Sequence, residues 1–248
     1  MGKIFTPSLF PEIDLGNAEK IVQSKYKERW TNEKAMSFGL ELCAEATFSG
    51  KYGIPKLQKF IGDVPKRFVT LSELSDLVPP NTGVLGFSHD YKLNELICRP
   101  DRYISKLLKY SCVGEPDFSM RVGDPLAAFI ASSLRSHCVA YYLQKNGCSV
   151  IPTMKWADTR SYDVCFDGYE RGGIVLISTM GVLKDERSHM YFVNGFTEML
   201  KRVSPDAIII YGDIKEWIVD LFPNQMTVYF VQNEHLNRMR SYGRKRCI

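Results

Sequence analysis

Charged and aromatic side chains gather directly after two short β-prone runs of the sequence. Asp117 follows the run at 110–115, and Lys155 and Trp156 follow the run at 148–154. In folds built from repeated βα units, ligands bind at the carboxyl ends of the strands. Side chains at such ends are therefore candidates for one shared site. The full set of candidates is His89, Asp90, Glu115, Asp117, Lys155, Trp156, Asp158, Ser178, Thr179 and Asp213.

Paired carboxylates are the chemistry that this set favours. Carboxylates crowded in a partly dry pocket repel one another, so the pKa of one rises and it can act as an acid while its neighbour stays ionised as a base. We expect Asp117 and Asp158 to form such a pair. With Asp90 or Asp213 beside them, the same oxygen ligands could hold Mg²⁺ or Mn²⁺. The alternative is that acids after strands cap helix N-termini, and Asp158 and Asp213 could each do only that.

Lys155 and Trp156 allow further chemistry at the same edge. A lysine in a desolvated site can lose its proton and act as a base or form a Schiff base, and an indole can stack on a sugar or a nucleobase. The simpler alternative is that Lys155 pairs with Asp158 while Trp156 packs over the end of the sheet. Ser178 and Thr179 open a loop that suits a phosphate near a helix N-terminus.

Sequence signatures of common cofactor sites are missing. The chain contains no GxGxxG, GxxxxGK[ST], HExxH or CxxC pattern, so a nicotinamide, P-loop or zinc site is unsupported. The four histidines are scattered, and no metal ligands are assigned from them. His137 falls on the apolar stripe of a predicted helix and is expected to be a core histidine.

The composition is that of an ordinary globular protein, with 45% hydrophobic and 24% charged residues. Seven widely spaced cysteines, an odd number, indicate a reducing compartment. No apolar stretch approaches the roughly 20 residues of a membrane-spanning helix. We therefore expect a cytoplasmic protein with no membrane partner.

The end of the chain is strongly basic. The stretch at 238–246 contains five basic residues and no acid, within a chain whose net charge is +4. Such a run could contact the phosphates of a nucleic acid; the alternative is a solvated helix end and tail. The five residues are Arg238, Arg240, Arg244, Lys245 and Arg246.

The elements that must position these residues are strands alternating with helices. The β-prone runs lie at 67–71, 83–88, 110–115, 148–154, 173–179, 206–212 and 226–232. Some are apolar throughout, which indicates burial on both faces. Regular alternation of strand and helix predicts a parallel sheet, because each return to a parallel neighbour needs a crossover.

The predicted fold is an α/β fold with a parallel sheet, closed into a TIM-like (β/α)₈ barrel, regular or irregular; the alternative is an open doubly wound sheet. The stretch at 48–57 is the candidate for an eighth unit. The longest predicted helix spans 124–147, with Asp124 as N-cap and Gly147 as the stop. We expect one domain over 1–248. Its parts are a partly helical section at 1–66, βα units at 67–235 and a basic tail at 236–248.

Four stretches of the chain carry a family resemblance: PDFS at 116–119, VIPTMKWAD at 150–158, VCFDG at 164–168 and GFTEMLKRVSPDAIIIYG at 195–212. Their order and spacing resemble the bacterial and phage family called domain of unknown function 4417, which is common on prophages and mobile elements. The resemblance covers about residues 50 to 231. It implies a phage or mobile-element origin and a shared fold, and no activity.

One departure from the family pattern falls at SHDYKL. Where the family is expected to carry two acids, His89 stands in place of the first and Asp90 matches the second. A metal or acid–base role of that pair would therefore be altered in this chain.

Two functions from different classes follow. The first is an acidic pocket that acts on or binds a nucleotide, a nucleic acid or a phosphorylated sugar, as a hydrolase or transferase in a bacterial cell or phage-infected host. The same pocket could also capture a small signalling nucleotide without turnover. The second is a non-catalytic factor that binds DNA or a host protein, in replication or against host defence, with the basic run as its nucleic-acid contact.

Overall fold

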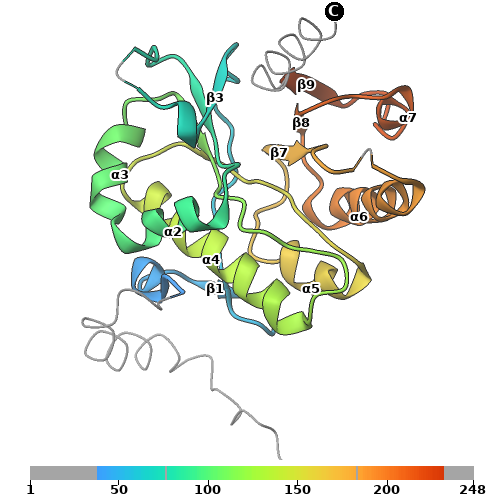
Figure 1. Ribbon diagram of the computed structural model, residues 1–248, viewed down its shortest axis with the longest axis horizontal. Coiled ribbons are helices and arrows are strands. Elements are labelled where there is room, and N and C mark those ends of the chain that lie inside the picture. The colour runs from blue at the N-terminus through green and yellow to red at the C-terminus, as the bar shows by residue number, and fades with distance from the viewer. Residues whose placement is uncertain (1–37, 76, 183, 232–248) are drawn as a thin grey trace, which may run out of the picture.

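The computed structural model describes residues 38–75, 77–182 and 184–231, and it alternates parallel strands with helices (Figure 1). Its strands are β1 (Phe48–Ser49), β2 (Ile54–Pro55), β3 (Phe68–Thr70), β4 (Gly83–Leu85), β5 (Cys112–Gly114), β6 (Val150–Ile151), β7 (Ile174–Ser178), β8 (Ala207–Tyr211) and β9 (Thr227–Val231). Its helices are α2 (Asp90–Cys98), α3 (Pro100–Leu107), α4 (Leu126–Lys145), α5 (Tyr162–Cys165), α6 (Glu186–Val203) and α7 (Glu216–Val219), with the 3₁₀ turns η1 (Leu40–Cys43), η2 (Leu71–Glu73) and η3 (Thr159–Ser161).

The strands pair in the order in which they occur along the chain. β3, β4, β5 and β6 form one parallel sheet, and β7, β8 and β9 form a second. A parallel bridge between Thr153 and Leu176 joins the two sheets just beyond β6. The predicted α/β fold of βα units around parallel strands is therefore confirmed, and the order of the described strands shows no reversal of the kind that defines a doubly wound sheet.

The helices cover one face of these sheets. Val113 and Val150 share a buried cluster with α2, α3 and α4, and Ile177 and Ile210 share another with α5, α6 and α7. In Figure 1 the helices accordingly follow one another around the outside of the strands. The opposite face is also buried, although none of the helices in the described part covers it. Its cluster includes Leu85, Cys112, Ile151, Leu176 and Ile209, each at most 1% exposed.

That inner face is buried because the sheet curls on itself. The rings of Phe87, just after β4, and Tyr211, at the end of β8, stack with their centroids 5.1 Å apart. In a flat sheet these two strands would lie about 19 Å apart, since neighbouring strands are spaced by about 4.8 Å. Among the described residues no ladder joins β9 to β3.

Two local predictions differ from the structure. The stretch at 48–57 forms the antiparallel hairpin of β1 and β2 and not an eighth parallel strand, because Gly50 and Gly53 adopt positive φ and turn the chain back. The long helix begins at Leu126, and Asp124 accepts a hydrogen bond from the Arg121 backbone N–H instead of capping that helix. Its predicted stop at Gly147 fits a φ of 90° there. In the described part of the chain, none of the helices has the length and apolar character needed to cross a membrane.

Candidate functional site

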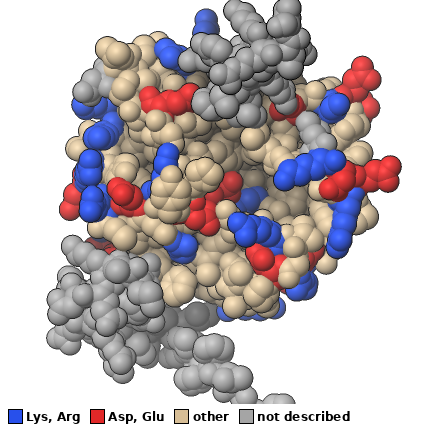
Figure 2. Space-filling model, in the orientation of Figure 1, with Lys and Arg blue, Asp and Glu red and all other residues tan. Residues whose placement is uncertain are grey.

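A cavity of about 1230 Å³ opens at the carboxyl ends of the strands. Its wall is built by the segments that follow β3, β4, β5, β6 and β7 and by the end of β8. Figure 2 shows this face of the molecule hollowed near its centre, with both basic and acidic side chains around the hollow. The cavity therefore lies where the strand-end rule places a ligand site in a βα fold.

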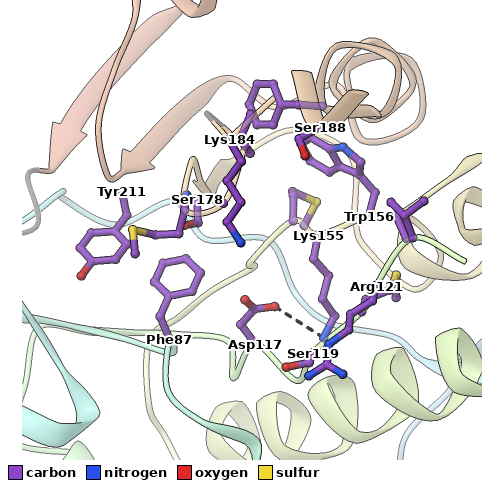
Figure 3. A pocket seen from close by; sticks show the side chains of 18 of the residues that line it. Phe87, Asp117, Ser119, Arg121, Lys155, Trp156, Ser178, Lys184, Ser188 and Tyr211 are labelled. Atoms are coloured by element: carbon purple, nitrogen blue, oxygen red, sulfur yellow. Dashed lines mark hydrogen bonds and ion pairs between the residues drawn. The ribbon is translucent and has the colours of Figure 1, made fainter. Parts of the chain in front are cut away.

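Asp117 and Lys155 meet at the floor of the cavity (Figure 3). Asp117 is held after β5, where its backbone N–H donates to the Gly86 carbonyl at 3.0 Å. The Lys155 ammonium donates to the Phe118 carbonyl at 2.9 Å and to Ser136 Oγ at 2.5 Å, and it lies 3.9 Å from Asp117 Oδ1. The Asp117 side chain is 31% exposed and that of Lys155 10%, so cavity water reaches the carboxylate more readily than the ammonium.

Burial moves the pKa values of both groups toward neutrality. Desolvation lowers the pKa of Lys155, against the opposing charges of Asp117 and Glu115. Desolvation likewise raises the pKa of Asp117, against the opposing charge of Lys155, and Asp90 raises it further. Shifts in these directions favour exchange of a proton between either group and a ligand.

Glu115 lies beneath this floor and has no exposed surface. Its Oε2 accepts hydrogen bonds from the Thr153 backbone N–H at 3.0 Å and the Tyr169 hydroxyl at 2.8 Å. Its Oε1 lies 3.7 Å from Nε2 of His137 on α4. Burial raises the pKa of Glu115 to about 7, against the effect of the Lys155 charge. Glu115 is therefore a buried neighbour of the cavity and not part of its wall.

Besides Glu115, three further expected carboxylates do not line the cavity. Asp90 accepts hydrogen bonds from the backbone N–H and hydroxyl of Ser119, at 3.0 and 2.9 Å. Asp158 caps η3 and binds the Arg160 guanidinium at 2.6 Å, and that hydrogen bond lowers its pKa. The backbone carbonyl of Asp213 accepts from the Thr179 hydroxyl at 2.7 Å.

The ion pairs therefore differ from those expected. Asp117 contacts Lys155, whereas Asp158 contacts Arg160, so neither an Asp117–Asp158 pair nor a Lys155–Asp158 pair forms. Within the described ranges, no group of three or more His, Cys, Asp and Glu side chains could hold a metal ion.

The cavity wall carries more cations than anions, in contrast to the acidic pocket expected from the sequence. Its basic residues are Lys92, Arg121, Lys155, Lys184 and Arg187, and its acidic residues are Glu73, Asp117 and Asp185. The difference arises because Asp90 and Asp158 turn away to make the contacts described above. Figure 3 shows the side chains of Lys184 and Arg121 in the same cavity as those of Asp117 and Lys155.

Some of the other expected residues line the cavity, and others are buried behind its wall. Trp156 lines the cavity; its indole N–H donates to the Tyr191 carbonyl at 3.1 Å, and the ring lies so close to Gly195 of α6 that any side chain there would collide with it. His89 and Ser178 also line the cavity, and Thr179 is buried behind it. The basic run at 238–246 lies outside the described residues.

Three residues of the site and its support were not among the residues predicted from the sequence. Phe87 and Lys184 line the cavity, and the strand-end rule could have found Phe87. Tyr169, which holds Glu115, directly follows the VCFDG stretch. There Gly168, with a φ of 80°, lies against the His137 ring and the Pro55 carbonyl, where a β-carbon would be 3.0 and 2.7 Å from them. This stretch therefore supports the buried side of the site.

Lys155→Met is expected to lower the free energy of unfolding by about 2 kcal/mol at pH 8, because it leaves the Asp117 carboxylate without its cation and Ser136 without its donor. The cost should be smaller at pH 5, where Asp117, whose pKa is raised, takes up a proton more readily. Urea denaturation at both pH values measures this. Adding Asp117→Asn should restore most of the loss. A cost that is independent of pH and persists in the double variant would contradict the ion pair. Lys184→Met, an exposed lysine of the same wall, serves as the control.

Comparison with known proteins gives consistent results along most of the chain. The family model described as Domain of unknown function (DUF4417) matches residues 46–229. The chain is 29% identical over 194 residues to "Gene 1 protein" of Mycobacterium phage L5. This alignment covers 75% of the present chain and 82% of the phage L5 protein. It is 32% identical over 129 residues to "Gene 1 protein" of Mycobacterium phage D29, with 52% of this chain and 48% of that protein covered, so the match spans about half of that relative. No solved structure matches.

Proposed function

The chain belongs to the family described as Domain of unknown function (DUF4417), with relatives in phages, and on that premise we propose that its cavity binds a nucleotide and acts on it as a hydrolase or transferase. The observation that carries this proposal is the combination of groups in one cavity. A carboxylate–ammonium pair lies at the floor, aromatic side chains line the wall, and cations with no partner among the described residues stand beside them.

The cations are suited to the phosphates of such a ligand. The side chains of Arg121 and Lys184 have no hydrogen bond or ion pair with the described part of the chain, although both line the cavity. Arg187 makes one long hydrogen bond of 3.4 Å to the Tyr191 hydroxyl. Unpaired guanidinium and ammonium groups in a concave wall bind phosphate oxygens through charge-assisted hydrogen bonds. The same groups would stabilise charge that develops during phosphoryl transfer.

The aromatic side chains are suited to the base. Phe87, Tyr211 and Trp156 all line the cavity, and Phe87 and Tyr211 already stack on one another with an angle of 12° between the rings. Stacking of a base on an aromatic ring contributes about 1–3 kcal/mol. A nucleotide satisfies both parts of the wall, whereas a phosphorylated sugar would satisfy only the cations.

Asp117 is the group proposed to act on the ligand. Its carboxylate is the acid at the floor, is open to cavity water and has a raised pKa. Such a group can take a proton from an attacking water or hydroxyl. Lys155 keeps the carboxylate in place and balances its charge.

The proposal includes a barrel-like fold for the domain. Strands in chain order, helices on the outside and a buried inner face are the features of a (β/α)₈ barrel. The described strands supply most of such a barrel, and the curl shown by the Phe87–Tyr211 contact supports it.

Binding is tested by calorimetry with inorganic phosphate, ribose 5-phosphate and nucleoside mono-, di- and triphosphates. A nucleotide should bind more tightly than inorganic phosphate, and Arg121→Met and Lys184→Met should each weaken nucleotide binding by about 10-fold, a loss of roughly 1.4 kcal/mol. Lys109→Met removes an exposed lysine outside the cavity and should leave the affinity unchanged.

Absence of binding by every phosphate compound, or an equal loss in the Lys109 variant, would contradict the proposal. Incubation followed by chromatography separates action from capture: intact nucleotide would mean that the cavity binds without turnover. Oligonucleotide binding that disappears on deletion of 238–248 would instead favour the nucleic-acid function expected from the basic run.

A further inference from the structure

Two buried polar atoms beneath the cavity lack hydrogen-bond partners in the described part of the chain. They are Glu115 Oε1 and His137 Nε2, and they face each other at 3.7 Å. Both side chains are at most 1% exposed, so bulk water does not satisfy them. An unsatisfied buried polar atom costs about 1–3 kcal/mol, and two such atoms side by side call for a shared explanation.

The tautomer of His137 follows from its other nitrogen. Nδ1 lies 2.8 Å from the Pro55 carbonyl oxygen. A carbonyl oxygen can only accept, so Nδ1 carries a hydrogen and donates it. In a neutral imidazole the second nitrogen then presents a lone pair, and His137 Nε2 needs a donor.

The contacts of Glu115 indicate which of its oxygen atoms would carry a proton. Its Oε2 already accepts two hydrogen bonds, from the Thr153 N–H and the Tyr169 hydroxyl. A proton on the carboxyl group therefore belongs on Oε1, the oxygen that faces His137. In that form the carboxylic acid faces Nε2 with its proton, and a slight approach of the two atoms, from 3.7 Å to within hydrogen-bond distance, gives both unsatisfied atoms a partner.

We propose that Glu115 and His137 share one buried proton between Oε1 and Nε2, and that this neutral pair is a positioning element that leaves Asp117 as the anionic partner of Lys155. The positioning role rests on the function proposed above, whereas the shared proton does not. The hydrogen bond is the only bond that forms, and the pair transfers no proton to a ligand.

Charge balance around the pair supports a neutral Glu115. Lys155 and Asp117 already supply one cation and one anion, so a second buried carboxylate would lack a partner of its own. Burial raises the pKa of Glu115 to about 7 and lowers that of His137 to about 3, the directions that a neutral pair requires. The titratable groups that face the pair and its neighbours are Asp90, Asp117, Lys155, Cys165 and Tyr169.

Glu115→Gln tests the shared proton because glutamine has the shape and hydrogen-bonding pattern of the protonated acid. Its NH₂ can donate to His137 Nε2, and its carbonyl can accept from Thr153 and Tyr169. A carboxyl group whose pKa rises from 4.5 to about 7 on folding stabilises the fold fully below pH 4.5 and loses that effect as pH rises through 7. The wild-type folding constant should therefore fall relative to that of the variant by about 150-fold between pH 4.5 and pH 8.

The other titratable groups occur in both proteins, so to first order their effects cancel in this difference. Denaturant unfolding of the wild type and of Glu115→Gln across the pH range measures this difference in stability. Glu95→Gln is the matched control, since Glu95 also accepts a hydrogen bond from a tyrosine hydroxyl, at 3.2 Å, but is partly exposed. A stability difference between the wild type and Glu115→Gln that stays constant with pH would overturn the shared proton.

A second measurement does not depend on stability. Infrared spectra of the wild type at pH 6 should contain a carboxylic-acid C=O band that Glu115→Gln lacks, and a carboxylate in its place would overturn the proposal. Neither readout needs a ligand, so failure of the nucleotide function would not affect them. Where turnover is found, Glu115→Gln should remove the limb of the pH–rate profile near pH 7 while keeping the rate. A limb that persists in the variant would overturn the positioning role.

Discussion

Asp117→Asn is expected to lower turnover of the bound nucleotide by about 100-fold or more, because general acid–base groups contribute roughly 10²–10⁴ to rate. Asparagine keeps the shape of the side chain and loses the proton-accepting oxygen. The fold should lose little stability, since burial raises the pKa of Asp117, which favours its uncharged form, and Lys155 keeps its hydrogen bonds to the Phe118 carbonyl and Ser136. Single-turnover assays and urea denaturation measure the two effects.

The matched control is Glu73→Gln, which removes another carboxylate from the cavity wall. Its amide oxygen can still accept the Thr70 hydrogen bonds that Glu73 accepts at 2.8 and 2.9 Å. Turnover in this variant should stay within about fivefold of the wild type, a smaller loss than removal of an acid–base group produces. Equal losses in the two variants would mean that the cavity needs only negative charge. A large loss of stability in Asp117→Asn would show that the acid is structural.

Gly86→Ala is expected to lower the free energy of unfolding by about 3 kcal/mol or more, at or above the usual cost of overpacking. A β-carbon on Gly86 would lie 2.1 Å from the Glu115 carbonyl oxygen and 2.7 Å from that of Gly114. These neighbours are backbone atoms that cannot rotate away, so β4 and β5 would have to separate. Urea denaturation measures the loss.

The same separation would displace Asp117, whose N–H donates to the Gly86 carbonyl. Nucleotide binding should therefore weaken together with stability. Gly62→Ala is the control, because the nearest atoms to a β-carbon there, at 3.0 Å, belong to the Phe60 ring, which is a side chain and not backbone. A cost below about 1 kcal/mol for Gly86→Ala would contradict the close approach of these two strands.

The position of the site could be predicted from the sequence, since parallel strands bring their carboxyl ends to one edge. The direction in which each acidic side chain points could not be predicted in the same way. Asp90 and Asp158 follow strands as Asp117 does, yet each hydrogen-bonds to neighbouring loop atoms. Whether an acid at a strand end caps a turn or faces a cavity depends on loops that fold against it from elsewhere in the chain.

Glu115 shows what alternation along a strand could have revealed. Successive residues of a strand point to opposite faces, so Glu115 shares the face of Val113, which packs with the helices. A carboxyl group on a helix-covered face must find buried partners. The sequence placed His137 in the core, but its contact with Glu115 depends on how α4 packs across the sheet, which no local pattern specifies.

The cluster beneath the cavity joins parts of the chain that leave the ribosome at very different times. Pro55 and His137 are separated by 82 residues, and Glu115 and Tyr169 by 54. Synthesis proceeds from the N-terminus, so a growing chain can pack α4 before Tyr169 exists. A glutamate in contact with water is ionised at neutral pH, so we expect Glu115 to stay charged until its buried partners are in place. On the protonation state proposed above, uptake of one proton from solvent would mark the moment at which this part of the site is complete.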